Sequence, residues 1–148
     1  MRELFERITS PFRGKSEQSR HKNLLNAAMA ACALVAMADD DERLAELAMR
    51  DRVLLRLKEL EDFDTQKAID VYDRHVQLIA SNSVDGRKAA MDVLSNVRGD
   101  RRDSERLVKI CVAIGRADHT FSPRERSVVE DICRSLDLHP GDLGVYDL

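Results

Sequence analysis

The chain is poor in the residues on which several structural classes depend. Its 148 residues include no Trp, two Tyr, four Phe, six Gly and three Pro. With so few aromatic residues, the core must rest on aliphatic side chains, and nucleic-acid binding by base stacking is disfavoured. With so little Gly and Pro, a loop-rich or disordered chain is disfavoured too. The remaining composition, 43% hydrophobic and 34% charged, is typical of a soluble, mostly helical domain.

The sequence also contains no long apolar segment and no disulfide framework. The longest apolar run, residues 24–38, is interrupted by Asn26 and is shorter than a membrane span. Residues 1–15 contain no continuous apolar stretch, so we expect no secretory signal. Three cysteines cannot all pair within one chain. These features favour the reducing cytoplasm.

Charge is unevenly distributed, although the net charge is only −3. Residues 1–22 carry six Lys or Arg against three Glu, whereas the remainder carries 18 Lys or Arg against 24 Asp or Glu. We therefore divide the chain into a short amphipathic basic helix with its linker, residues 1–19, and a helical domain, residues 20–148. The basic segment is suited to weak contact with an anionic membrane surface, and packing against the domain is the alternative.

Apolar residues recur at helical spacing along the chain, and no segment alternates with period two. Ser10, Pro11 and Gly14 predict a break after the first helix, and residues 81–86 predict another. Asp64 is expected to cap a helix, and residues 122–125 (Ser-Pro-Arg-Glu) form a capping box with Pro at the first helical position. The sequence thus predicts an all-α bundle of about seven helices over residues 2–8, 20–38, 43–57, 65–79, 89–97, 104–117 and 123–136.

Two of these predicted hairpins are copies of one another, 79 residues apart. In each copy an apolar helix ends in Ala-Asp, and a Glu follows seven residues after the Asp. The identical pairs are Cys32/Cys111, Ala38/Ala117, Asp39/Asp118, Glu46/Glu125 and Leu57/Leu136. A repeated carboxylate pair at a turn between two helices is the strongest indication of function in the sequence.

The position of Asp39 and Asp118 requires a compensating charge or donor. Both follow apolar helices, and the C-terminal end of a helix carries partial negative charge. One candidate is a neighbouring helix whose free N–H groups the Asp would cap. The other is a divalent cation held by Asp, Glu and helix-end carbonyls, since calcium takes six to eight oxygen ligands.

Glu46 favours a role beyond capping. Arg43 stands where the second copy has Ser122, so the first copy lacks a capping box and yet retains the Glu. The predicted ligands are Asp39, Asp40 and Glu46 at a first site and Asp118 and Glu125 at a second. We expect calcium, with magnesium or zinc as alternatives, because His119 in the second turn is a zinc ligand type.

Two other chemistries receive less support from the sequence. Cys32 and Cys111 would suit thiol chemistry, but they lie with Cys133 on apolar helix faces, where Cys behaves as a small hydrophobic residue. The histidines are scattered, and no phosphate-binding loop, nucleophile elbow or Cys-x-x-Cys motif is present. We therefore expect a protein that is not an enzyme.

The duplicated Asp…Glu hairpin resembles the tellurite-resistance protein TerB family over nearly the whole chain. The resemblance begins with Arg-His-Lys-Asn at residues 20–23, continues through Phe-Asp-Thr at 63–65, and ends with Ser-Leu-Asp-Leu-His-Pro at 135–140. TerB-like domains usually carry Asp-Gly at each turn, whereas Asp40 and His119 occupy the Gly positions here.

The resemblance implies an all-helical domain of about seven helices with a cation-binding acidic surface. It also implies a part in tellurite and general stress responses, and association with an integral-membrane partner at the inner face of the membrane. No catalytic reaction and no nucleic-acid partner follow from it. The alternative function is a metal-free protein–protein interaction module, in which the acidic turns are helix caps.

Overall fold

The computed structural model describes residues 2–39, 44–60, 62–118 and 121–148, with side chains from Ser19 onward except that of Asp118. This part of the chain is helical and contains no strand, so the predicted all-α class is confirmed. Its elements are α1 (Arg2–Ala36), α2 (Leu44–Leu60), α3 (Thr65–Ser81), α4 (Ser83–Leu94), η1 (Ser95–Val97), α5 (Arg101–Asp118), α6 (Pro123–Ser135), η2 (Pro140–Leu143) and η3 (Val145–Asp147), the η elements being 3₁₀ turns.

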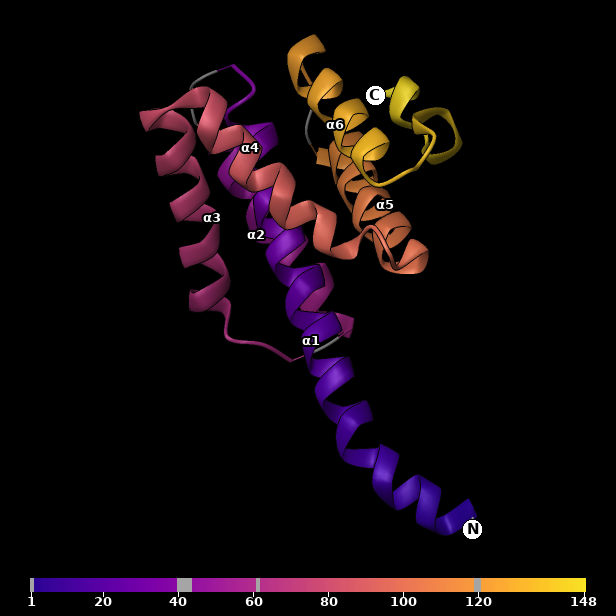
Figure 1. Ribbon diagram of the computed structural model, residues 1–148. Coiled ribbons are helices and arrows are strands. Elements are labelled where there is room, and N and C mark those ends of the chain that lie inside the picture. The colour runs from indigo at the N-terminus through magenta and orange to yellow at the C-terminus, as the bar shows by residue number, and fades with distance from the viewer. Residues whose placement is uncertain (1, 40–43, 61, 119–120) are drawn as a thin grey trace.

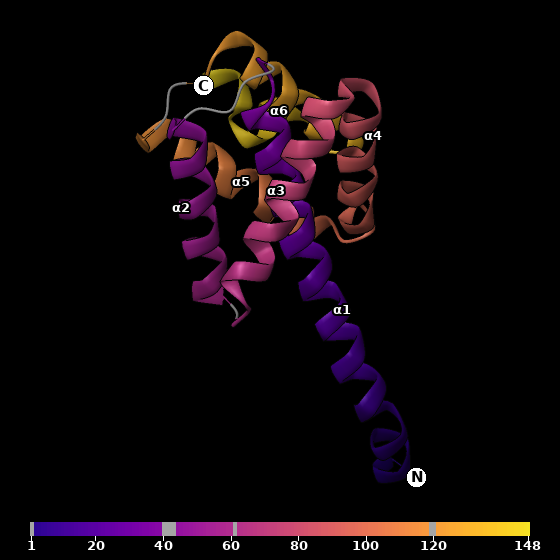
Figure 2. The same cartoon turned by 90° about the vertical axis from the view of Figure 1, so that its left-hand side faces the viewer.

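The predicted break after the first helix is wrong, and this accounts for six described α-helices instead of seven. α1 continues through Pro11 and Gly14, and its N-terminal part extends away from the bundle (Figures 1 and 2). Proline removes one helical hydrogen bond and Gly lowers helix propensity, but Lys, Glu and Gln at positions 15–18 are good helix formers. The division into residues 1–19 and 20–148 stays a prediction.

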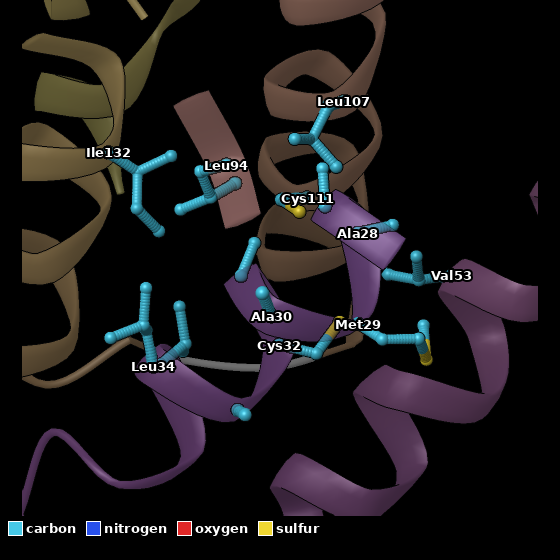
Figure 3. Close-up of a cluster of buried hydrophobic side chains, with 14 of the residues drawn as sticks. Ala28, Met29, Ala30, Cys32, Leu34, Val53, Leu94, Leu107, Cys111 and Ile132 are labelled. Atoms are coloured by element: carbon cyan, nitrogen blue, oxygen red, sulfur yellow. The ribbon is translucent and has the colours of Figure 1, made fainter. Parts of the chain in front are cut away.

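The C-terminal half of α1 is the centre of the bundle. Residues 27–38 are buried on every side of the helix, and α1 packs against α2, α3, α4 and α6. Figure 3 shows Ala28, Met29 and Cys32 of α1 among side chains of the surrounding helices. A helix that is apolar all round is stable in water only when other helices enclose it. The many Ala residues let those helices approach closely.

The central pair, α3 and α4, meets at one residue. Asp64 is the N-cap of α3, as predicted, and accepts hydrogen bonds from the N–H groups of Gln66 and Lys67 at 3.0 and 3.3 Å. The predicted break over residues 81–86 shrinks to Asn82, which ends α3 and caps α4 by accepting from the Asp85 N–H at 3.1 Å. Asn82 is therefore both the C-cap of α3 and the N-cap of α4, and it replaces the expected loop. α4 begins at Ser83.

The two repeated hairpins interlock. α1 and α2 pack on each other in the first, whereas the described residues of α5 and α6 in the second do not pack closely on each other; α6 packs on α1, and α2 packs on α5. This exchange brings the end of α1 to the beginning of α6. Among the described helices, α1 included, none has the length and apolar character needed to cross a bilayer.

Gly86 provides a test of the α3–α4 packing. It lies in the first turn of α4, where an added Cβ would sit 2.5 Å from the Ile79 backbone. We expect Gly86→Ala to lower the free energy of unfolding by about 1–3 kcal/mol, because the two helices must separate. Urea denaturation followed by circular dichroism measures the change.

Gly99→Ala is the matched control, since a Cβ there meets no atom within 4 Å. It should leave stability unchanged or raise it by up to about 1 kcal/mol through the unfolded chain's entropy. Equal effects of the two substitutions would contradict the close helix contact.

Candidate functional site

Asp39 follows α1 in a short turn, and its carboxylate points to the start of α6. Its Oδ2 accepts a hydrogen bond from Ser122 Oγ at 3.3 Å. Arg124 Nε lies 3.8 Å from Asp39 Oδ1. The helix N-terminus carries partial positive charge, so this position offsets the cost of a carboxylate beside the C-terminal end of α1. Among the described residues, the helix that compensates Asp39 is therefore α6, whose N-cap Ser122 lies 83 residues further along the chain.

The second copy contributes the predicted capping box. Ser122 Oγ accepts from the Glu125 N–H at 3.1 Å, and Glu125 Oε1 accepts from the Ser122 N–H at 3.2 Å. Pro123 occupies the first helical position, where its missing N–H costs no hydrogen bond. These contacts hold the Glu125 side chain, which is only 3% exposed, in one orientation.

Asp39 and Glu125 therefore flank Ser122, and we call these three residues the Ser122 cluster. The sequence predicts Asp39 as a ligand of a first cation site and Glu125 as a ligand of a second, because it places each copy in a separate hairpin. The structure brings the Asp of one copy and the Glu of the other to the same residue. The cause is the packing of α6 on α1.

The other predicted ligands are described only in part. Glu46 lies in the first turn of α2 and is 5% exposed, so the two repeated Glu residues are equally buried. Asp40 and His119 lie outside the described residues, as does the side chain of Asp118, whose backbone ends α5. Within the described part, no three His, Cys, Asp or Glu residues are grouped to hold a metal ion. The ligand sets stay predictions.

Sequence reasoning missed Arg87. This residue of α4 donates a hydrogen bond from its guanidinium to the Met37 carbonyl, just beyond the end of α1, and another to Ser83 Oγ at 3.0 Å. A cation at a helix C-terminus is favoured by the helix dipole. Arg87 and Met37 are 50 residues apart, so no local pattern could have indicated the contact. Arg124 was missed for the same reason.

The Ser122 cluster offers oxygen donors of the kind that bind hard cations. The Asp39 carboxylate contacts the Ser122 hydroxyl and the Glu125 carboxylate contacts the Ser122 N–H. Calcium and magnesium prefer oxygen ligands of this kind to nitrogen or sulfur. The donor set thus fits a divalent cation by its chemistry. The same contacts form a complete helix cap with two arginines supplying positive charge. Both interpretations of the turn therefore rest on identified contacts.

The three cysteines are buried free thiols, as their positions on apolar faces predicted. Burial raises the pKa of Cys111 to about 12 and that of Cys133 to about 11, and it holds the pKa of Cys32 well above the usual value. The neighbouring Cys111 raises the pKa of Cys32 further. Because the thiolate is the reactive and metal-binding form, these residues act as core side chains in the folded protein.

A double-mutant cycle tests the contact between the copies. We expect Ser122→Ala to cost about 1 kcal/mol of unfolding free energy, because α6 loses its N-cap. Asp39→Asn should lower stability less in that background than in the wild type, with a coupling energy of about 0.5 kcal/mol or more. Urea unfolding of the four proteins gives the coupling.

Ser127→Ala, at an exposed position of α6, is the matched control and should change stability by less than about 0.5 kcal/mol. Additive effects of Asp39→Asn and Ser122→Ala would show that the two side chains do not interact.

The buried thiols predict slow chemical modification. At pH 8 the folded protein should react with an aromatic disulfide reagent about 100-fold more slowly than the guanidinium-unfolded protein, since little thiolate forms well below pH 11. The reaction should accelerate as pH rises towards the thiol pKa values. Rapid labelling of any thiol in the folded state would contradict this placement, and absorbance of the released thiol measures it.

Comparison with known proteins identifies the family. Residues 25–146 match the family described as tellurite resistance protein TerB, which is nearly the whole chain. No curated protein and no solved structure matches the chain. The matched range contains both repeated hairpins, the Ser122 cluster and the central helix pair. The chain therefore belongs to the tellurite resistance protein TerB family.

Proposed function

We propose that this protein is a non-enzymatic component of a tellurite-resistance and stress response. We further propose that it binds a divalent cation, with calcium as the expected ion, at its duplicated acidic turns. Membership of the TerB family supports the tellurite-related role, and TerB is not a known enzyme family. The observation that carries cation binding is the Ser122 cluster, where carboxylates from both repeats contact one residue: Asp39 accepts from the Ser122 hydroxyl, and Glu125 accepts from the Ser122 N–H.

In this proposal Asp39, Ser122 and Glu125 hold one cation. Asp118 and Glu46, their repeat counterparts, hold a second, with Asp40 adding a carboxylate to the acidic surface. The bound cation supplies positive charge that neutralises the turn. The capping box orients Glu125, and the hydrogen bond from the Ser122 hydroxyl orients Asp39. Arg124 is exposed and pairs with Asp39 at long range, so its side chain can move into solvent when a cation binds.

Neutralising the turns would set the affinity of the acidic body for a partner. Outside residues 1–22 the chain has an excess of six negative charges, and such a surface repels acidic partners and anionic lipid. We propose that cation occupancy relieves this repulsion and allows association with an integral-membrane partner at the cytoplasmic face. The basic residues at the N-terminal end of α1, within residues 1–22, would add weak contact with anionic headgroups.

A metal-free interaction module is the second candidate, and a specific observation favours it. Arg87 already donates a hydrogen bond to the Met37 carbonyl at the end of α1, and Arg124 lies beside Asp39. These arginines and the capping box can account for the acidic turn without a cation. In that case the acidic surface would recruit proteins directly.

Thermal melting of chelator-stripped protein separates the two candidates. Calcium at about 100 times its dissociation constant should stabilise the folded state by about 2.7 kcal/mol, because it binds the native turns and not the unfolded chain. The double variant Asp39→Asn, Glu125→Gln should lose the part of this shift that the Ser122 cluster contributes and remain helical, since Gln also serves in a capping box. Calorimetric titration then counts the sites.

The matched control is Asp70→Asn with Asp92→Asn, two exposed carboxylates on α3 and α4. This variant changes net charge equally and should retain the full calcium-dependent shift. Unchanged melting of the wild type with calcium, magnesium and zinc would favour the metal-free module. Protein partners captured equally well with and without chelator would favour it too.

A further inference from the structure

A cleft of about 490 Å³ lies between the C-terminal end of α2 and the N-terminal half of α5. It shares no residue with the Ser122 cluster. Most of its lining residues are exposed, so the cleft is an open groove between two helices. An open groove of this shape suits a chain segment, which covers its whole length, better than an enclosed small molecule.

Positive charge dominates the walls of the groove. Arg102, Arg106 and Lys109 line it from α5, and Arg56 lines it from α2. Two carboxylates, Glu59 and Glu105, leave an excess of two positive charges in a chain whose net charge is −3. Glu59 pairs with Arg56 at 3.7 Å, and Glu105 pairs with Lys109 at 3.8 Å. The groove is therefore complementary to an acidic ligand.

The cations are arranged as a row. Arg102, Arg106 and Lys109 follow the i, i+4, i+7 spacing of one helix face, and Ala113 continues it at i+11. At 1.5 Å per residue, the three cations span about 10 Å and the face as far as Ala113 spans about 16 Å. Arg106 forms an ion pair with Asp103, in which Nη1 lies 3.8 Å from Oδ1, and Asp103 is only 3% exposed. Arg102 has no ion pair with any residue that the structure describes.

The groove also has apolar surface that a purely anionic ligand would leave uncovered. Leu60, at the end of α2, is 55% exposed, and Ile110 and Ala113 lie on the α5 side. Among the described residues that line the groove none is aromatic, so they offer no stacking platform for nucleic-acid bases. An occupant must combine negative charge with apolar side chains at helical spacing.

We propose that the α2–α5 groove binds an acidic amphipathic helix of a partner protein. Its Asp and Glu side chains pair with the row formed by Arg102, Arg106 and Lys109. Its apolar face covers Leu60, Ile110 and Ala113. The groove shares no residue with the acidic turns, so binding there persists in chelator.

The test measures fluorescence anisotropy with a labelled peptide of about four to five helical turns. The probe carries Leu at i, i+4, i+7 and i+11, Glu beside this stripe and Ala elsewhere. We expect micromolar binding that weakens as NaCl rises from about 50 to about 300 mM, because salt screens the ion pairs. A peptide of identical composition with the Leu stripe scrambled should bind about tenfold more weakly.

Two charge-reversal variants locate the site. Arg102→Glu with Lys109→Glu should weaken binding about tenfold or more, because both ends of the cationic row are reversed. Lys67→Glu with Lys88→Glu, exposed positions on α3 and α4, makes the same change in net charge and should leave binding within about twofold. Leu60→Ser tests the apolar part and should also weaken binding.

Four results would overturn the proposal. They are no peptide binding up to about 1 mM, equal effects of the two charge-reversal variants, equal binding of the scrambled peptide, and tighter binding of a single-stranded oligonucleotide. Self-association that Arg102→Glu with Lys109→Glu abolishes would also overturn it, since the occupant would then be a second copy. Sedimentation velocity without peptide detects that case.

Discussion

The fold depends on burying one helix on all sides. The second half of α1 has no polar face except at its two ends, so it requires neighbours around its whole circumference. α3 and α4 supply one side, and α2 and α6 supply the other. Its Ala residues bury little surface each, but they bring the surrounding backbones near enough for Leu, Ile and Val side chains to interdigitate. The core is therefore built around α1 and not between two independent hairpins.

That requirement explains the exchange between the repeats. A single helix–turn–helix hairpin can cover only one side of α1, so α6 must cross over from the second copy. The crossing places the turn after α1 against the first turn of α6. Asp39 then meets the only part of a helix where a carboxylate is favoured, which is its N-terminus. The acidic residues of the two copies converge as a consequence of core packing.

Helix-end electrostatics link this turn to its possible functions. The end of α1 receives a guanidinium from Arg87, and the start of α6 receives the carboxylate of Asp39. Both contacts satisfy groups that a helix leaves without partners within itself. A cation binding among the same oxygens would compete with arginines for negative charge. In the proposed function, cation binding would therefore be coupled to the packing of α4 and α6 on the end of α1.

Local sequence patterns determined the helical class, the repeat and the best-defined helix starts. Asp64 and Ser122 were identifiable because N-caps act over three or four residues, and the burial of the three cysteines followed from their apolar helix faces. The family also followed from motifs in the chain, and the family match confirms it. The continuous α1 was missed, because Pro11 and Gly14 weaken a helix locally without preventing it.

Only the tertiary structure decided which charged groups meet. Asp39 with Ser122, and Arg87 with Met37, are separated by 83 and 50 residues, and no periodicity links such positions. The groove between α2 and α5 arises in the same way, from helices that local patterns place in different hairpins. Helix formation depends on neighbours a few residues away. The assembly of a site depends on which helices the buried α1 brings together.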